Sequence, residues 1–119
     1  EQEQTTKETM MPKYMFNASY TTEGVQGLLS DGGSARVAAA NAAMESVGGT
    51  LESFYFAFGE SDAVIIADFP SNAAAAAVSL AVSASGMVAG SMTVLLTPEE
   101  IDAATATVSG AMTYSPPGT

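Results

Sequence analysis

The sequence predicts a single α+β domain, a βαββαβ sandwich whose four-stranded antiparallel sheet carries helices on one face, followed by an extra C-terminal helix. Two observations predict it. Segments that alternate between apolar and other residues, as strands do, are interspersed with alanine-rich segments of helical periodicity. In addition, 119 residues suffice for one domain with a single core and leave no room for a second.

The first strand and two helices are expected before residue 48. The run KYMFNASY, residues 13–20, has the period-two pattern of a strand. Thr21 or Thr22 can cap a short helix that continues to Leu29, where SDGG, residues 30–33, breaks it. A second helix follows and ends at Gly48-Gly49. One face of that helix carries Val37, Ala40, Met44 and Val47.

A central hairpin and a third helix come next. Residues 51–58 and 62–69 are rich in aromatic and β-branched side chains, and the turn GES joins them as two strands. Pro70-Ser71-Asn72 opens an alanine-rich helix that runs to Ser85, where Gly86 stops it. Residues 87–96 then form the fourth strand, which completes the ferredoxin-like order with two β-α-β crossovers.

Each end of the chain is expected to form an arm, and a last helix precedes the C-terminal arm. Thr97-Pro98-Glu99-Glu100 combines a threonine cap, proline at the first helical position and glutamate three residues after the cap, so a last helix starts there and runs to about Val108. The run YSPPG, residues 114–118, predicts an extended arm. Residues 1–10 form a polar N-terminal arm, and residues 11–119 form the domain with its tail.

Composition excludes several classes of function. The 13 acidic residues face only three basic ones, which gives a net charge of −10 and argues against binding nucleic acid or anionic lipid. Cysteine and histidine are absent, so disulfides, thiol catalysis and histidine-ligated metals are excluded, and we expect no metal and no cofactor. No segment is apolar enough over sufficient length to predict membrane insertion.

Alternation within the strands predicts self-association. Phe54, Phe56 and Phe58 would face one side of the sheet, and Leu51, Tyr55 and Ala57 the other. The helices can cover only one side, so the other side would expose an apolar patch. We therefore expect a homo-oligomer through the open sheet face, of the dimeric α+β barrel type, with exchange of a terminal arm as a further contact.

Several segments together resemble GYD-domain proteins. They are MPKYMF (residues 11–16), ASY (18–20), GGSAR (32–36), GGTLE (48–52), FYFAFG (54–59), LLTPEEI (95–101) and YSPPG (114–118). The resemblance implies a ferredoxin-like fold related to the dimeric α+β barrels, a cytoplasmic location and no established activity. The chain departs from the family at Gly59-Glu60-Ser61-Asp62, where serine replaces the tyrosine of the Gly-Tyr-Asp signature.

The candidate binding residues combine phenols, an amide and the single arginine. A pocket between sheet and helices would use the phenols as donors and the amide as an orienting group; in the simpler interpretation the tyrosines are core or interface residues. The segment from Asp31 to Arg36 is also a candidate anion site, against the simpler reading of a glycine elbow between helices. The candidate pocket residues are Tyr14, Asn17, Tyr20, Arg36 and Tyr55.

Three functions remain open on this evidence. The first is a small homo-oligomeric binding module for an unknown small molecule, as the resemblance suggests. The second is a structural self-assembling protein that uses its terminal arms, exported if a signal peptide was removed before Glu1. The third is a cofactor-free enzyme of the α+β barrel superfamily that works through tyrosine and carboxylate side chains; it ranks last because the chain has no histidine.

Overall fold

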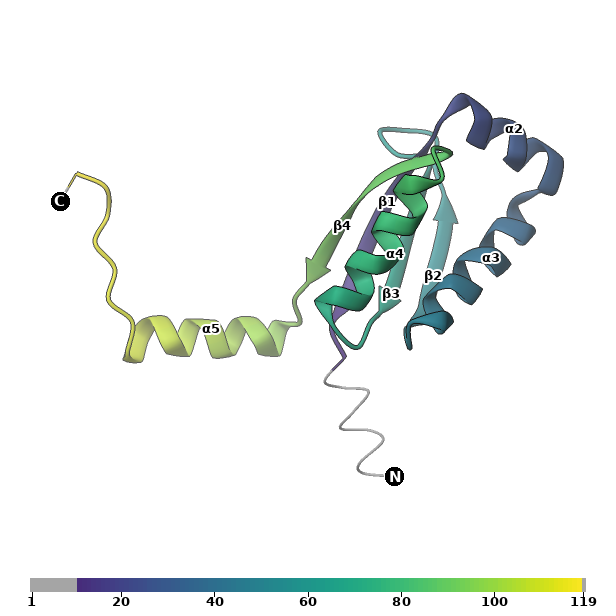
Figure 1. Ribbon diagram of the computed structural model, residues 1–119. Coiled ribbons are helices and arrows are strands. Elements are labelled where there is room, and N and C mark those ends of the chain that lie inside the picture. The colour runs from purple at the N-terminus through teal and green to yellow at the C-terminus, as the bar shows by residue number, and fades with distance from the viewer. Residues whose placement is uncertain (1–10, 119) are drawn as a thin grey trace, which may run out of the picture.

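The fold is seen in a computed structural model, which describes residues 11–118 (Figure 1). The polar arm expected for residues 1–10 lies outside the described residues. The elements follow in the predicted order, each boundary within two residues of its expected place. They are β1 (Lys13–Tyr20), α2 (Thr22–Asp31), α3 (Gly33–Ser46), β2 (Thr50–Phe56), β3 (Ala63–Asp68), α4 (Asn72–Ala84), β4 (Val88–Leu95) and α5 (Pro98–Gly110).

The four strands form one antiparallel sheet in the order β2-β3-β1-β4. β1 and β3 are the central strands, and β2 and β4 are the edges. α3 and α4 lie against the same face of this sheet (Figure 1). The architecture is therefore the predicted α+β, ferredoxin-like sandwich with helices on one face.

The core lies between the central strands and the two longer helices. Tyr14, Phe16 and Ala18 of β1 are buried, and they pair in register with buried residues of β3. Side chains alternate along a strand, so these residues share the helix-covered face. Met44 of α3 and Val78 of α4 complete the same cluster. The partners of the β1 residues are Ala67, Ile65 and Ala63, respectively.

One expectation about β2 is wrong. The alternating pattern places Leu51 opposite Phe54 and Phe56, but the register with β3 shifts between Leu51 and Ser53. This bulge adds one residue, Glu52, and so brings Leu51 onto the face of the two phenylalanines. Leu51 and Phe54 both pack against the core. The helix-free face thus carries fewer apolar side chains than the sequence pattern suggests.

The helix-free face nevertheless has an apolar centre. Met15, Val64 and Ile66 are half-buried there, and Tyr55 is 70% exposed. Small polar side chains surround them, so the face is mixed in character. The polar members are Asn17, Ser53, Ser91 and Thr93.

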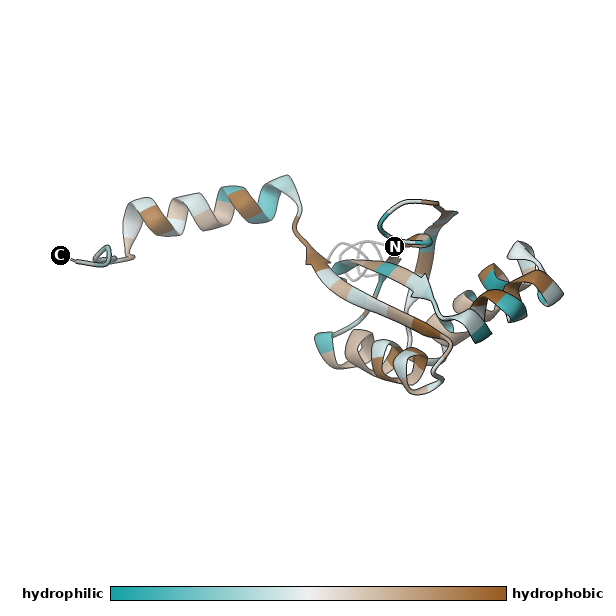
Figure 2. Ribbon diagram, turned by 90° about the horizontal axis from the view of Figure 1, so that it is seen from above, coloured by the Kyte–Doolittle hydropathy of each residue, from teal (hydrophilic) through white to brown (hydrophobic). Residues whose placement is uncertain are grey.

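α5 stands apart from the sandwich. Figure 1 shows it extending from the end of β4, with the C-terminal segment continuing beyond it. Residues 96–118 are all exposed, and they include apolar side chains at Ile101, Val108 and Met112. Hydropathy colouring shows apolar residues recurring along this helix (Figure 2). We call residues 96–118 the C-terminal arm; none of its residues is buried in the described part of the chain.

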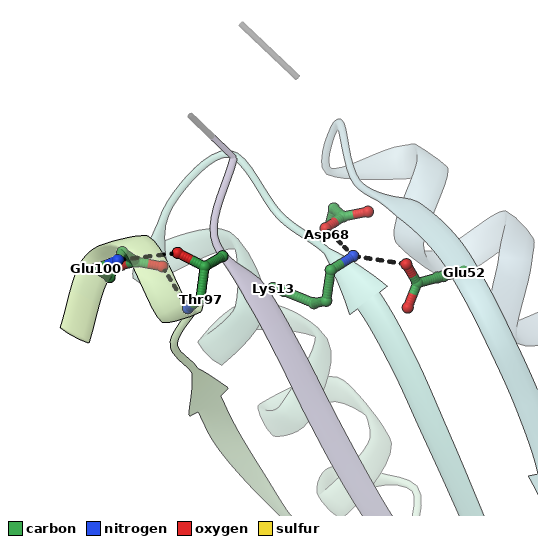
Figure 3. A network of polar contacts seen from close by, with 5 residues as sticks. All are labelled: Lys13, Glu52, Asp68, Thr97 and Glu100. Atoms are coloured by element: carbon green, nitrogen blue, oxygen red, sulfur yellow. Dashed lines mark hydrogen bonds and ion pairs between the residues drawn. The ribbon is translucent and has the colours of Figure 1, made fainter. Parts of the chain in front are cut away.

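An ion network joins three strands at one end of the helix-free face (Figure 3). The ammonium group of Lys13 in β1 lies 2.7 Å from a carboxylate oxygen of Glu52 in β2 and 2.9 Å from one of Asp68 in β3. Burial alone would lower the pKa of Lys13, but hydrogen bonds to Glu52 and Asp68 raise it above its ordinary value of 10.5.

We expect Lys13→Met to lower the free energy of unfolding by less than about 1 kcal/mol, because the network is partly solvated. Since the folded-state pKa is raised, the contribution of Lys13 is complete below pH 10.5 and is lost as pH rises through the folded value. Urea unfolding at pH 7 and above pH 11 measures this, with Lys13→Arg as the charge-retaining control. A stability difference that stays constant across this range would contradict the assignment.

Candidate functional site

A cleft separates α3 from α4 over the sheet. α3 packs mainly on β2 and α4 on β4, so the helices diverge above β1 (Figure 1). Two adjoining hollows occupy this region: an inner one of about 90 Å³ between α3 and α4, and an outer one of about 310 Å³ between α2 and the end of α4. We call them together the interhelical cleft. Both hollows are lined by Tyr20, Arg36, Val82 and Val88.

Small side chains keep the cleft open. Ala39, Ala40 and Ala43 line it from α3, and Ala81 lines it from α4. The methyl group of alanine is too short to bridge the gap between the two helices, so the space stays unfilled. The floor of the inner hollow is formed by the sheet, where core residues such as Phe16 and Ile65 line it. The lining of the inner hollow is therefore mainly apolar, whereas the outer hollow also contacts Asp31, Arg36 and Ser85.

α2 forms the outer wall and is held tightly at its start. The Thr21 hydroxyl accepts a hydrogen bond from the Gly24 amide at 3.2 Å, which caps the helix. The Thr21 backbone amide donates to the Met87 carbonyl oxygen at 2.9 Å. Gly24 lies so close to this carbonyl that a Cβ would come within 2.0 Å of it. α2 is thus anchored to the entrance of β4.

Arg36 is the cationic group of the cleft. It is half-buried in the first turns of α3 and makes no ion pair with any described acidic residue. Asp31, at the end of α2, lines the outer hollow with it but does not form a salt bridge. α3 itself begins at Gly32 without a side-chain cap. A positive charge inside an apolar cleft is suited to an anionic group of a ligand.

The five residues predicted to form one pocket are divided among three places. Tyr20 and Arg36 meet in the interhelical cleft. Tyr14 is buried near the start of α4, where its hydroxyl donates to Asn72 and its ring packs edge-on against Phe69. Asn17 and Tyr55 lie on the opposite face of the sheet, in one row on either side of Val64.

Sequence reasoning missed the walls of the cleft. The sequence pattern indicates the alanines of α3 only as helix formers and core residues, whereas in the structure Ala39, Ala40 and Ala43 line an unfilled space opposite Val78 and Val82 of α4. Two alanine-rich helices predicted on one sheet face were the available signal. At the edge of the cleft, the Tyr20 backbone amide donates a hydrogen bond to the Asp62 carboxylate at 2.8 Å.

Among residues 11–118, no group of three or more acidic side chains is placed to hold a metal ion. None of the helices in this part of the chain has the length and hydropathy of a membrane span. The structure is that of a small α+β sandwich domain with a mainly apolar cleft, in which Arg36 and Asp31 are the charged lining residues.

The family model of the GYD domain matches residues 14–105, from β1 into α5. This match spans most of the chain, so the protein belongs to the GYD domain family, as the resemblance of its motifs implied. No curated protein and no solved structure matches the chain. Family membership does not identify a ligand, so the chemistry of a ligand has to be inferred from the residues that line the cleft.

The anchoring of α2 can be tested at two glycines of the same helix. We expect Gly24→Ala to lower the free energy of unfolding by about 1–3 kcal/mol, because the added methyl group collides with the Met87 carbonyl. Gly27→Ala meets nothing within 4 Å and should raise it by about 0.5–1 kcal/mol through helix propensity. Equal effects of the two substitutions in thermal or urea unfolding would show that α2 is not seated against β4.

Proposed function

We propose that this protein is a small homo-oligomeric binding module, and that its ligand is a small amphipathic molecule with an apolar body and one anionic group. The observation that carries the proposal is the interhelical cleft, an unfilled apolar space with Arg36 at its edge. The cleft volume lies near the lower end of the range common for small-molecule sites, about 300–1,000 Å³.

The apolar lining favours a hydrophobic ligand body. Ala81, Val82 and Met87 offer almost no hydrogen-bonding partners to water in the outer hollow. Replacing that water by hydrocarbon or an aromatic ring is favourable by about 25 cal/mol per Å² of apolar surface covered. The inner hollow continues toward Met44 and Val78, so an elongated ligand would place its apolar end toward the core.

Arg36 favours an anionic group at the other end of the ligand. The net charge of −10 repels anions at long range, yet at 0.15 M salt this repulsion is screened beyond about 8 Å. Within the cleft the half-buried guanidinium acts at short range and low dielectric, where its attraction is much stronger. The Tyr20 side chain, which lines both hollows, adds a phenol to the polar end.

The homo-oligomeric part of the proposal depends on the helix-free sheet face. Its centre, formed by Met15, Val64, Ile66 and the exposed Tyr55, is suited to packing against a copy of itself around a two-fold axis. We also propose a cytoplasmic location, which the family membership supports.

Binding can be measured with two fluorescent probes of similar shape. Anilinonaphthalene sulfonate carries an anionic group, and N-phenylnaphthylamine is neutral. We expect Arg36→Gln to weaken binding of the anionic probe about tenfold, or about 1.4 kcal/mol, and to leave the neutral probe unchanged. Ala81→Phe should weaken both probes, because the ring fills the outer hollow.

Lys13→Gln is the matched control for Arg36→Gln. It removes the same charge from the helix-free face and should change neither affinity. If Arg36→Gln and Lys13→Gln reduce binding of the anionic probe equally, net charge and not the cleft governs that binding. If Ala81→Phe leaves both probes bound as before, the interhelical cleft is not their site.

Self-association through the sheet face is tested at Tyr55, which is exposed enough to be changed without loss of the core. We expect Tyr55→Asp to reduce the oligomer mass measured by light scattering at micromolar concentration. Leu29→Asp, on exposed α2, makes the same charge change away from the sheet and should leave the mass unaltered. A wild-type chain that is already monomeric, or equal effects of both variants, would rule out this interface.

A further inference from the structure

Two large apolar side chains of α5 lie on one side of the helix. Ile101 and Val108 are seven residues apart, a spacing that places both on a single stripe, and Met112 follows two residues after the end of the helix. Val108 is 63% exposed and Met112 is 52% exposed. An amphipathic helix of 13 residues gains most of its stability from packing that stripe against something.

The first turn of α5 is stabilised by a capping box. The Thr97 hydroxyl accepts a hydrogen bond from the Glu100 amide at 3.1 Å, and the Glu100 carboxylate accepts one from the Thr97 amide at 3.0 Å (Figure 3). Pro98 at the first helical position restricts the same joint. Only Leu96 and Thr97 separate β4 from the helix. The capping box therefore stabilises the first turn of α5, and the helix lies away from the sheet of its own chain (Figure 1).

A groove lies along α4. It has a volume of about 410 Å³ and runs beside the edge strand β4, where Ala76, Leu80 and Val94 line it. Leu80 is 71% exposed, although it belongs to a helix that packs on the core. The groove runs along α4 from Asn72 to Leu80, and α5 has 13 residues, so an arm laid along the groove is long enough to cover it.

The distribution of charge indicates which molecule fills the groove. No charged residue occurs between Asp68 and Glu99, and none follows Asp102. The groove and most of the arm are therefore neutral surfaces on a chain of net charge −10. Two copies of such a chain repel each other wherever their carboxylates approach, and they come together at least cost where both are uncharged.

We propose that α5 of one copy lies in the α4–β4 groove of a second copy, and that the two copies exchange arms around a two-fold axis. The stripe formed by Ile101 and Val108, with Met112 just beyond the end of the helix, would then cover Leu80 and Val94 of the partner copy. This contact is separate from the helix-free sheet face and does not depend on a ligand in the interhelical cleft.

The absence of native cysteine allows a direct test by disulfide cross-linking in the full-length chain. Leu80→Cys and Val108→Cys variants are prepared separately, mixed and oxidised under mild conditions. We expect a cross-linked species of twice the chain mass that contains one copy of each variant. The matched control is Thr107→Cys, one position along α5 and about 100° around the helix, which should cross-link to Leu80→Cys at least tenfold less.

Two results would overturn the proposal. One is equal cross-linking from positions 107 and 108, which would indicate random collision. The other is an intrachain disulfide in the Leu80→Cys/Val108→Cys double variant at high dilution, with no cross-link between the mixed single variants, because the arm would then fold back on its own body. The cleft probes report independently of this contact, so failure of one proposal is distinguishable from failure of the other.

Discussion

Packing on one face of the sheet is the constraint on which the rest of this structure depends. Ala18, Ala63 and Ala67 lie beside Phe16, Tyr14 and Ile65 in a single buried layer between the central strands and the helices. Small residues let backbones approach closely there. Alanine is also abundant in α3, where Ala39, Ala40 and Ala43 are too short to fill the space next to α4, so one compositional feature contributes to both the core and the cleft.

Charge placement complements this packing. The acidic residues lie mostly on loops, helix ends and α2–α3, while α4, β4 and most of α5 carry none. Copies of a strongly acidic chain repel one another, and this repulsion is weakest at the region without charged residues. The exposed side chains of Leu80 and Val108 lie in that neutral region. Within the described part of a single chain, no other segment covers these two side chains.

The element order and the helix starts could be predicted because they depend on local chemistry. Thr21, Ser71 and Thr97 each accept a hydrogen bond from a backbone amide in the first turn of a helix, as their positions in the sequence suggest. The binding site was harder to predict. Of five candidate residues only Tyr20 and Arg36 meet, because which face of the sheet a strand residue occupies, and how far two helices diverge, depend on partners distant in sequence.

The sequence by itself determined the α+β class, the order of strands and helices and the acidic, cysteine-free chemistry, since periodicity, caps and composition act over a few residues. Only the tertiary structure decided that Leu51 shares a face with Phe54, because the bulge at Glu52 exists only against β3. It alone also decided that Asn17 and Tyr55 face away from Arg36, and that α5 leaves the sandwich. These outcomes follow from register and packing between distant segments, which no local pattern encodes.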